Sequence, residues 1–290
     1  MSDDPFVRHR GLLFTVAYEL LGSAADAEDV VQETWLRWAD VDHDEVRDPR
    51  AYLVRTVSRQ ALNRMRTLAR RREDYVGEWL PEPLLTSPDV AEDVELAESV
   101  SMAMLTVLET LGPTERAVFV LREVFDVPFD EIAQAVDKSP AAVRQVAHRA
   151  RGHVAARRPR VRVGRGEQQR VVERFVDAVL TGDVQGLLDV LAPDVVAVAD
   201  GGGLARASRR PVVGAERMVA SLLGGLRKTA GAVTASVVWL NGAPGVRIEL
   251  DGELATAVSM TVEDGRITRL FAVANPHKLA RVDAEAALSR

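Results

Sequence analysis

The chain has 290 residues, 47% hydrophobic and 28% charged, a composition that is typical of globular proteins and excludes general disorder. Its apolar stretches are far shorter than the ~20 residues that cross a bilayer, and the amino terminus lacks a basic-then-apolar leader. The sequence contains no cysteine, which excludes disulfides, thiolate zinc sites and iron–sulfur clusters, and we expect a cytoplasmic protein without membrane contact.

Charge is strongly segregated along the chain, although the net charge is only −6. Residues 47–72 hold nine arginines and one acid, residues 73–98 hold nine acids and no base, and residues 138–165 hold nine bases and no acid. A single such run is usually a solvated helix face. Two basic segments that flank an acidic one instead predict binding to phosphates at two separate places.

The first third of the chain predicts three helices. Residues 8–39 carry apolar side chains at helical spacing, interrupted by Gly22-Ser23, so a pair of helices is expected there. Pro49 follows an acidic turn and is well placed to open a third helix. One face of that helix is apolar and the other is rich in arginine.

A linker and a new helical segment follow. Between Tyr75 and Ala91 the chain has three prolines, which cannot continue a helix, so we expect an extended linker and a domain boundary. The helical period returns at Ser99, stops at Gly112-Pro113, and restarts with Thr114 as the expected N-cap.

Residues 129–152 have the pattern of a helix-turn-helix. A short helix at 129–136 precedes a tight turn, after which Ser139-Pro140 supplies an N-cap and a first-turn proline. In the second helix the small apolar residues share one face, which leaves Arg144, Gln145, His148 and Arg149 pointing outward. Such side chains can contact base edges and phosphates in a major groove. The alternative is an ordinary helical hairpin with a basic surface.

The last part of the chain predicts an α+β domain. Helical patterns at 171–180 and 187–191 lead to an apolar segment at 195–199, and another helix is expected at 215–226. Four β-type segments follow, at 233–240, 246–250, 254–262 and 267–274. Asn241-Gly242, Asp251-Gly252 and Asp264-Gly265 separate them and are strong hairpin signals, so we expect an antiparallel meander.

Three segments in this order, 26–35, 48–55 and the helix-turn-helix ending at 148–151, resemble those of extracytoplasmic-function sigma factors. The resemblance implies that the second helix binds the β′ clamp helices of RNA polymerase, through Asp26, Asp29, Gln32, Glu33 and Arg37. It implies that the third helix binds and opens the minus-10 element, through Arg55, Arg59, Asn63, Arg64 and Arg66. It implies that the helix-turn-helix domain contacts the β flap and reads the minus-35 element, through Ser139, Arg144, Gln145, His148, Arg149 and Arg151.

The C-terminal portion is similar to SnoaL-like members of the NTF2-like fold, and the whole chain resembles the sigma-factor group with this extension, the sigma-J type included. Three segments carry that resemblance: Trp79, Leu80, Pro81, Glu82 and Pro83; Asp200, Gly201, Gly202 and Gly203; and Asn275, Pro276, His277, Lys278 and Leu279. The chain departs from the group at Leu204, where relatives usually have Lys, and at His277, where they usually have Asp. The resemblance implies that the extension restrains the sigma core through the linker, where the prolines lower the entropic cost of ordering and Trp79 offers an anchor.

Taken together, the sequence predicts a multi-domain fold. Two all-α sigma domains, a helical bundle (residues 1–74) and a helix-turn-helix domain (99–160), are joined by an acidic, proline-containing linker (75–98). A C-terminal α+β NTF2-like cone domain (167–290) completes the chain. The predicted function is an alternative sigma factor with core RNA polymerase and promoter DNA as partners, and no cofactor, metal or catalytic residue is expected.

Two other functions remain open. The cone domain can be an enzyme or a small-molecule sensor, for which Asp177, Asp194, Asp200 and His277 are the nearest acid–base candidates, although each has a simpler role as a surface, turn or tail residue. The chain can also be a helix-turn-helix repressor that never binds polymerase. That interpretation leaves residues 10–72 without a role.

Overall fold

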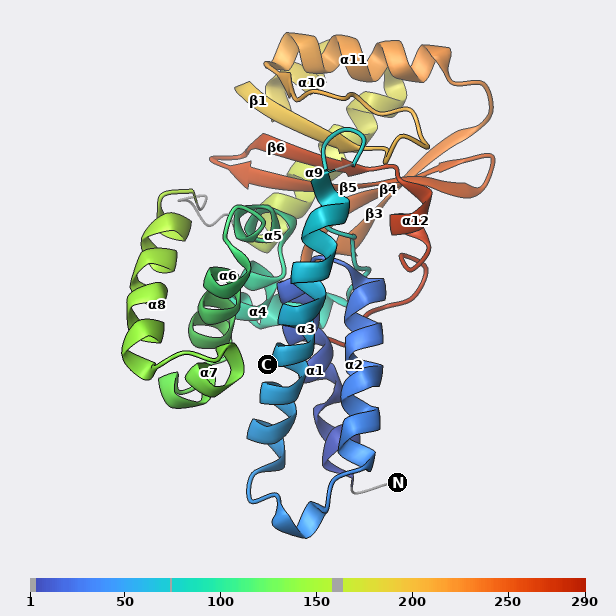
Figure 1. Ribbon diagram of the computed structural model, residues 1–290. Helices are drawn as coiled ribbons and strands as arrows, with labels where there is room; N and C mark the ends of the chain where they lie inside the picture. Colours follow the sequence, from blue (N-terminus) through green and yellow to red (C-terminus); the bar gives the residue numbers. More distant parts are fainter. Residues whose placement is uncertain (1–3, 74, 158–163) are drawn as a thin grey trace.

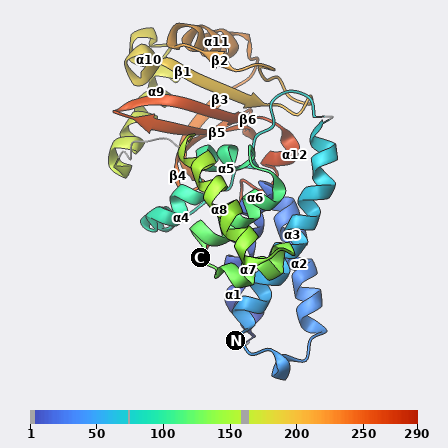
Figure 2. The same cartoon turned by 60° about the vertical axis from the view of Figure 1, so that its left-hand side comes forward.

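The computed structural model describes residues 4–73, 75–157 and 164–290, with residues 69–73 described by their backbone alone. Helices α1–α8 lie on one side of a six-stranded sheet, and helices α10 and α11 lie on the other (Figures 1 and 2). The expected boundaries at residues 74 and 160, and most of the basic stretch at 157–165, fall outside the described residues.

The amino-terminal helices form the expected bundle of α1 (Pro5–Leu21), α2 (Ala24–Ala39) and α3 (Pro49–Glu73), with a short turn η1 (His43–Glu45). Gly22 ends α1 in the left-handed conformation, with φ of 65°, and its amide donates to the carbonyl of Tyr18 at 2.7 Å. Ser23 then caps α2, since its hydroxyl accepts from the amide of Asp26 at 3.2 Å. The glycine and the serine therefore separate the two helices as the sequence predicted.

The acidic linker is only partly extended. No helix is present from Tyr75 to Ser87, but two short helices follow, η2 (Pro88–Glu92) and α4 (Val94–Ser99). They form because Pro88 occupies a first helical position and Asp93 Oδ1 accepts from the amide of Leu96 at 3.0 Å. The predicted linker thus holds as an extended segment up to Ser87.

The second helical domain contains α5 (Met102–Leu108), α6 (Pro113–Phe119), a π-helical turn η3 (Val120–Val124), α7 (Phe129–Val136) and α8 (Pro140–Ala155). Helix α6 begins earlier than predicted: Gly112, not Thr114, is the N-cap, because Pro113 has no amide proton to satisfy and suits the first helical position. One continuous hydrophobic core joins this domain to α1–α3.

The C-terminal domain has α9 (Arg165–Thr181), α10 (Val184–Val190) and α11 (Ala215–Lys228) against a sheet of order β2-β1-β6-β5-β4-β3. The strands are β1 (Leu191–Asp200), β2 (Val212–Val213), β3 (Val233–Leu240), β4 (Ala243–Leu250), β5 (Glu253–Glu263) and β6 (Arg266–Val273). The predicted antiparallel meander is β3–β6, with the three Asn/Asp-Gly pairs at its turns in left-handed conformations. Strand β1 is an addition: it pairs with β6 in parallel.

The sheet is buried on both faces because alternate side chains of its central strands point opposite ways. Val258 and Leu270 belong to the core shared with α9–α11. Phe271 and Val273 belong to a second cluster, together with Leu80 of the linker, Met102 of α5 and Leu279 of α12 (Pro276–Leu279). The linker is therefore packed between the sheet and the helical domains.

The end of the chain returns to the helical bundle. The amide of Ala286 donates to the carbonyl of Leu85 at 2.9 Å, and the amide of Ser289 donates to Thr15 Oγ1 of α1 at 3.1 Å. Arg290 forms ion pairs with Asp93 and Glu95. The carboxyl-terminal segment thus connects the C-terminal domain to α1 and α4. No helix in the described part of the chain is long and apolar enough to span a membrane.

Candidate functional site

Helix α8 presents the predicted polar face to solvent. Val143, Ala147 and Ala150 are buried, whereas Arg144, Gln145, His148 and Arg149 are all exposed. The helix is well fixed at its start, because Ser139 Oγ accepts from the amide of Ala142 at 3.2 Å and Pro140 follows the cap. Asp137, with φ of 54°, makes the turn from α7. The exposed face is free to contact a duplex.

Arg151 differs from the other predicted reading residues. Its Nε lies 3.6 Å from Glu123 Oε1 of η3, so the guanidinium faces back toward its own domain. About half of the side chain is exposed, which makes this a weak surface pair that a phosphate can replace.

Helix α2 displays the residues predicted to bind polymerase. Asp29, Gln32, Glu33 and Arg37 are exposed and Asp26 is half-buried. Trp35 and Leu36, which the sequence prediction did not include, are 45% and 53% exposed on the same helix. Exposed large apolar side chains beside charged ones are typical of a protein-binding surface. The sequence did hold a signal for this surface, because Leu36 is apolar at a position that does not fit the helical spacing of the buried residues.

Arg64 connects the predicted polymerase-binding and DNA-binding surfaces. Its guanidinium donates to Asp26 Oδ1 at 2.8 Å through Nε and to Asp29 Oδ2 at 3.2 Å through Nη2. The hydrogen bond to Asp26 is the main cause that raises the pKa of Arg64. Asn63 and Arg66, close to Arg64 in the sequence of α3, are exposed, and Arg66 Nη1 lies 3.4 Å from Asn63 Oδ1.

The two other predicted minus-10 arginines contact the helix-turn-helix. Arg59 donates through Nη2 and Nε to the carbonyl of Gln134, at 2.6 and 3.2 Å. Arg55 Nη1 donates to the side-chain Oε1 of the same residue at 3.0 Å. Gln134 lies on α7, so α3 and the first helix of the helix-turn-helix are tied together through these arginines.

Asp200, at the end of β1, organises contacts between the linker and the C-terminal domain. It is fully buried. Oδ1 accepts from Tyr75 Oη at 2.6 Å, and Oδ2 accepts from the amide of Leu80 at 2.9 Å and from Lys278 Nζ at 2.7 Å. Lys278 also donates to the carbonyl of Leu80 and lies 4.0 Å from the centre of the Trp79 ring. A buried carboxylate with this many donors holds the linker in place.

Glu82 connects the linker to α2. Its Oε1 accepts from Ser23 Oγ at 2.7 Å, and its Oε2 accepts from the amides of Ala24 and Ala25 at 2.7 and 3.2 Å. The carboxylate therefore caps the amino terminus of α2 from outside the helix, where the helix dipole favours negative charge. Burial nevertheless raises the pKa of Glu82. Pro81 and Pro83 on either side are buried.

The other predicted regulatory residues divide into two groups. Asn275 Nδ2 donates to Tyr75 Oη at 2.8 Å, and its Oδ1 accepts from the amide of His277 to cap α12. Pro276 is the first residue of that helix and Leu279 packs with Leu80. Gly201, Gly202 and Gly203 form the turn after β1. The side chain of His277 is exposed and stays outside the cluster.

Asn241 connects three parts of the chain, although sequence reasoning assigned it only to a turn. It is 1% exposed. Its Nδ2 donates to Tyr18 Oη at 2.7 Å and to the carbonyl of Val100 at 2.9 Å, and its Oδ1 accepts from the amide of Leu84. One turn residue therefore connects α1, the linker and α4. The sequence has no signal for contacts between residues so far apart.

A buried charged cluster lies where α1 meets the second helical domain. Glu19 is fully buried, accepts from Ser99 Oγ at 2.7 Å, and has one carboxylate oxygen without a partner. Burial raises the pKa of Glu19 to about 8. Arg116, 1% exposed, donates to the carbonyl of Glu19 at 2.8 Å and pairs with Glu109.

The acid–base candidates of the C-terminal domain lie apart from one another. Asp177, Asp194 and His277 are exposed. Asp200 is the exception to the prediction that each has a surface, turn or tail role, since it is fully buried and accepts from this chain's own donors at both oxygens. Within the described residues, no group of three or more His, Cys, Asp or Glu side chains could hold a metal ion.

Comparison with known proteins assigns the chain to a family. Residues 6–71 match the family model for sigma-70 region 2, and residues 101–154 match that for sigma-70 region 4. The ECF RNA polymerase sigma factor SigJ of Mycobacterium tuberculosis is 39% identical over 96% of this chain and 93% of its own length. The chain belongs to the ECF RNA polymerase sigma factors.

Further matches extend the similarity to the whole fold of this sigma factor. The crystal structure of M. tuberculosis SigJ superposes with a TM-score of 0.76 at 36% identity, covering 95% of this chain and 97% of that one. A probable ECF sigma factor SigI from the same species is 32% identical over 96% of this chain and 94% of its own length. The predicted architecture is confirmed: two helical sigma domains are followed by an α+β domain with a six-stranded sheet.

Proposed function

We propose that this ECF sigma factor is restrained in cis by its C-terminal domain. The restrained state is the closed arrangement, in which α3 contacts α7 and the C-terminal domain holds the linker. Sigma factors of this family bind core RNA polymerase and promoter DNA and direct transcription initiation. Such a protein acts where the polymerase acts, in the cytoplasm.

The observation that carries the proposal is the pair of bonds from Arg59 to the carbonyl of Gln134. In the proposed assignment Arg59 binds the minus-10 element, while α7 and α8 read the minus-35 element. The minus-10 and minus-35 elements lie tens of ångströms apart on a duplex that rises about 3.4 Å per base pair. The protein therefore cannot bind the two elements at once while its two DNA-binding surfaces contact each other. The helical domains must therefore separate before the promoter is engaged.

The C-terminal domain supports the closed state through the linker. Asp200 and Lys278 hold the linker from one side, and Glu82 and Asn241 connect it to α1 and α2. Because the linker joins the two helical domains, a linker fixed at four places limits how far they can move apart. Opening requires that these contacts break or rearrange.

The surfaces for polymerase follow from the same assignment. We assign the exposed face of α2, with Asp29, Glu33 and Trp35, to the β′ clamp helices, and the helix-turn-helix domain to the β flap. An apolar ring flanked by charges suits the centre of such an interface.

Run-off transcription tests the assignment. Full-length protein and core polymerase should give a transcript from a matched promoter, and none from the same fragment with scrambled minus-10 and minus-35 elements. Absence of transcript from a working promoter, with tight duplex binding by the protein alone, would instead support a repressor that acts without polymerase.

A further inference from the structure

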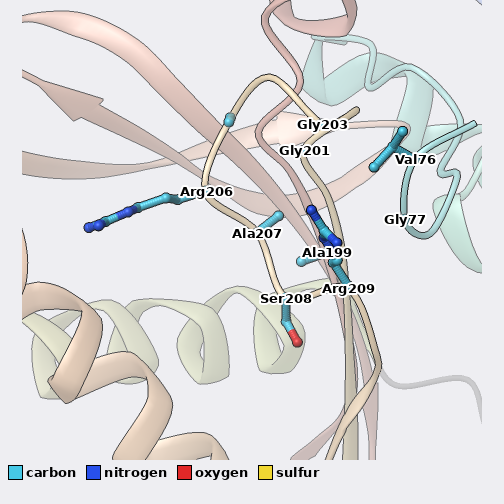
Figure 3. Close-up of a pocket in the computed structure, with 10 residues that line it drawn as sticks. Val76, Gly77, Ala199, Gly201, Gly203, Arg206, Ala207, Ser208 and Arg209 are labelled. Carbon is cyan, nitrogen blue, oxygen red and sulfur yellow. The ribbon is translucent and has the colours of Figure 1, made fainter.

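A small polar cavity lies between the linker and the loop that follows β1. It encloses about 220 Å³ and is walled by Val76 and Gly77 of the linker and by Gly201, Gly203 and Arg209 of the loop. Figure 3 shows the Arg209 side chain directed toward the glycine backbone, whereas the side chain of Arg206, which also lines the cavity, extends away from the glycines. The cavity is smaller than the roughly 300–1,000 Å³ of drug-sized pockets, so its occupant must be small.

The cavity is cationic. The loop from Gly201 to Pro211 contains Arg206, Arg209 and Arg210 and no acid. Among the described residues, none of these three guanidinium groups has a hydrogen bond or an ion pair. Glu78, the next acid along the linker, is not among the lining residues. Unpaired arginine in a partly enclosed space attracts an anion.

The buried carboxylate beside the cavity does not cancel this charge. Asp200 precedes the glycines, but Lys278 Nζ lies 2.7 Å from its Oδ2, and Tyr75 and the amide of Gly202 donate to its Oδ1. The Asp200 charge is therefore balanced by Lys278 of α12. Arg206 and Arg209 are left as the charged residues of the cavity lining.

The glycines keep the cavity open and polar. A Cβ at Gly201 would lie 2.5 Å from the carbonyl oxygen of Ala205, and one at Gly203, with φ of 74°, would lie 3.2 Å from Val76 Cβ. No side chain fits at these positions without displacement. Gly203 is exposed, and the cavity that it lines also contains the planar guanidinium of Arg209, whose fork of donors matches the oxygens of a phosphate.

We propose that this cavity binds a small phosphate, either inorganic phosphate or a small phosphomonoester, and that binding strengthens the contact between the linker and the C-terminal domain. One wall belongs to the linker and the other to the domain, so the complete cavity exists only when the linker is docked. A ligand that binds only this state stabilises it by RT ln(1 + c/Kd), where c is the ligand concentration, so the stabilisation rises with the logarithm of that concentration once the site is near saturation. The regulatory half of the inference rests on the proposed function, in which the docked linker is the restrained state.

The test uses the full-length chain and inorganic phosphate, with binding followed by calorimetry and linker docking followed by hydrogen exchange of residues 75–83. The wild-type protein should bind phosphate saturably, and the amides of the linker should exchange more slowly when it is bound. Arg209→Gln should weaken binding by about tenfold or more. The matched control is Arg210→Gln, in the same loop but outside the cavity lining, and it should bind as the wild type does.

The possible results of this experiment test the phosphate site and its regulatory role separately. Equal phosphate affinity in Arg209→Gln and wild type, or no saturable binding, would overturn the site. Binding without slower exchange at 75–83 would overturn its regulatory role. A third outcome is that the wild-type protein binds no phosphate, while Arg209→Gln, but not Arg210→Gln, lowers the affinity for a non-promoter DNA duplex. That result would show that the loop contacts nucleic acid and would also overturn the small-ligand site. None of these readouts depends on transcription, so failure here is distinguishable from failure of the sigma-factor assignment.

Discussion

Lys278 and Asp200 form a buried ion pair, and both side chains hydrogen-bond to Leu80 of the linker. They are 8% and 0% exposed, so removal of one charge leaves the other buried without its partner. Lys278→Met should lower the free energy of unfolding by about 3–5 kcal/mol, as measured by urea denaturation. Lys228→Met, at the exposed end of α11, should have little effect. The double variant Asp200→Asn with Lys278→Met should be more stable than Lys278→Met alone, and a double variant equally or less stable would contradict this account.

Arg144 and Arg149 are the residues expected to read the minus-35 element. Both are exposed on α8, and neither forms an ion pair among the described residues. Replacement of either by Ala should reduce promoter discrimination by about 1–3 kcal/mol if it forms a bidentate contact with a base. Transcription from promoters with single minus-35 substitutions measures this loss. An unchanged sequence preference after both replacements would refute the assignment.

At the scale of single residues, the sequence predicted local features such as exposure and turns, but not contacts between residues far apart in the chain. The exposure of Arg144 and Arg149 follows from helical periodicity around Val143 and Ala147. Asn241 gave a correct hairpin prediction, because Asn-Gly favours the left-handed turn. Its bonds to Tyr18 and Leu84 cross 223 and 157 residues and depend on the tertiary fold. Asp200 was predicted as regulatory, but its complete burial was not.

At the scale of elements, the linker completes helix α2. Glu82 accepts from Ser23 and from two amides of the first turn, and these amides have no partner inside the helix. Glu82→Ala should cost about 2 kcal/mol of stability and increase hydrogen exchange at the start of α2 and in the linker. Glu78→Ala, four residues earlier, is the matched control. Exchange at Ala24 and Ala25 that is the same in both variants would exclude the capping role.

The junction of α1 and α4 should be sensitive to pH. Glu19 has a pKa raised to about 8 from an ordinary value of 4.5, mainly by burial. The folded protein therefore binds more protons than the unfolded chain between these values, and the free energy of unfolding should fall as pH rises through this interval. Tyr18, Glu82, Arg116 and its ion-pair partner Glu109 are further charged or titratable groups near Glu19, and the raised pKa of Glu82 acts in the same direction.

The variant Glu19→Gln isolates the contribution of this residue. It should flatten the decline of stability between about pH 5 and 8, and its advantage over wild type should grow toward pH 8. Glu253→Gln, exposed at the start of β5, serves as the control. Parallel pH profiles for Glu19→Gln and wild type would show that Glu19 does not titrate as inferred.

The helices and strands that the sequence did not predict are mainly those that depend on contacts with other parts of the fold. Strands β3–β6 follow from alternation and turn dipeptides, which are local. The parallel pairing of β1 with β6 joins segments about 70 residues apart, and β2 is only two residues long. Helix α4 was not predicted because Asp93, its N-cap, is one of many acids in this segment and does not stand out as a capping residue.

For the whole molecule, the C-terminal sheet is packed on both of its faces. Its two buried faces hold α9–α11 on one side and the linker with α5 on the other. The carboxyl-terminal segment adds a contact, since Ser289 lies against α1. Separation of the sigma domains should therefore be limited both by the linker and by this segment.

A reversible covalent bond can test this restraint, because the chain contains no cysteine of its own. A Cβ built at Gly11 of α1 lies 3.7 Å from Ser289 Cβ, within the ~3.5–4.5 Å that disulfides span. In the double variant Gly11→Cys and Ser289→Cys, oxidation should fix the carboxyl-terminal segment on α1 and reduce promoter-dependent transcript, and a reductant should restore it. Gly11→Cys alone should respond to neither treatment. Equal transcript from the oxidised and reduced double variant would mean that the segment stays on α1 during initiation, and that opening occurs elsewhere.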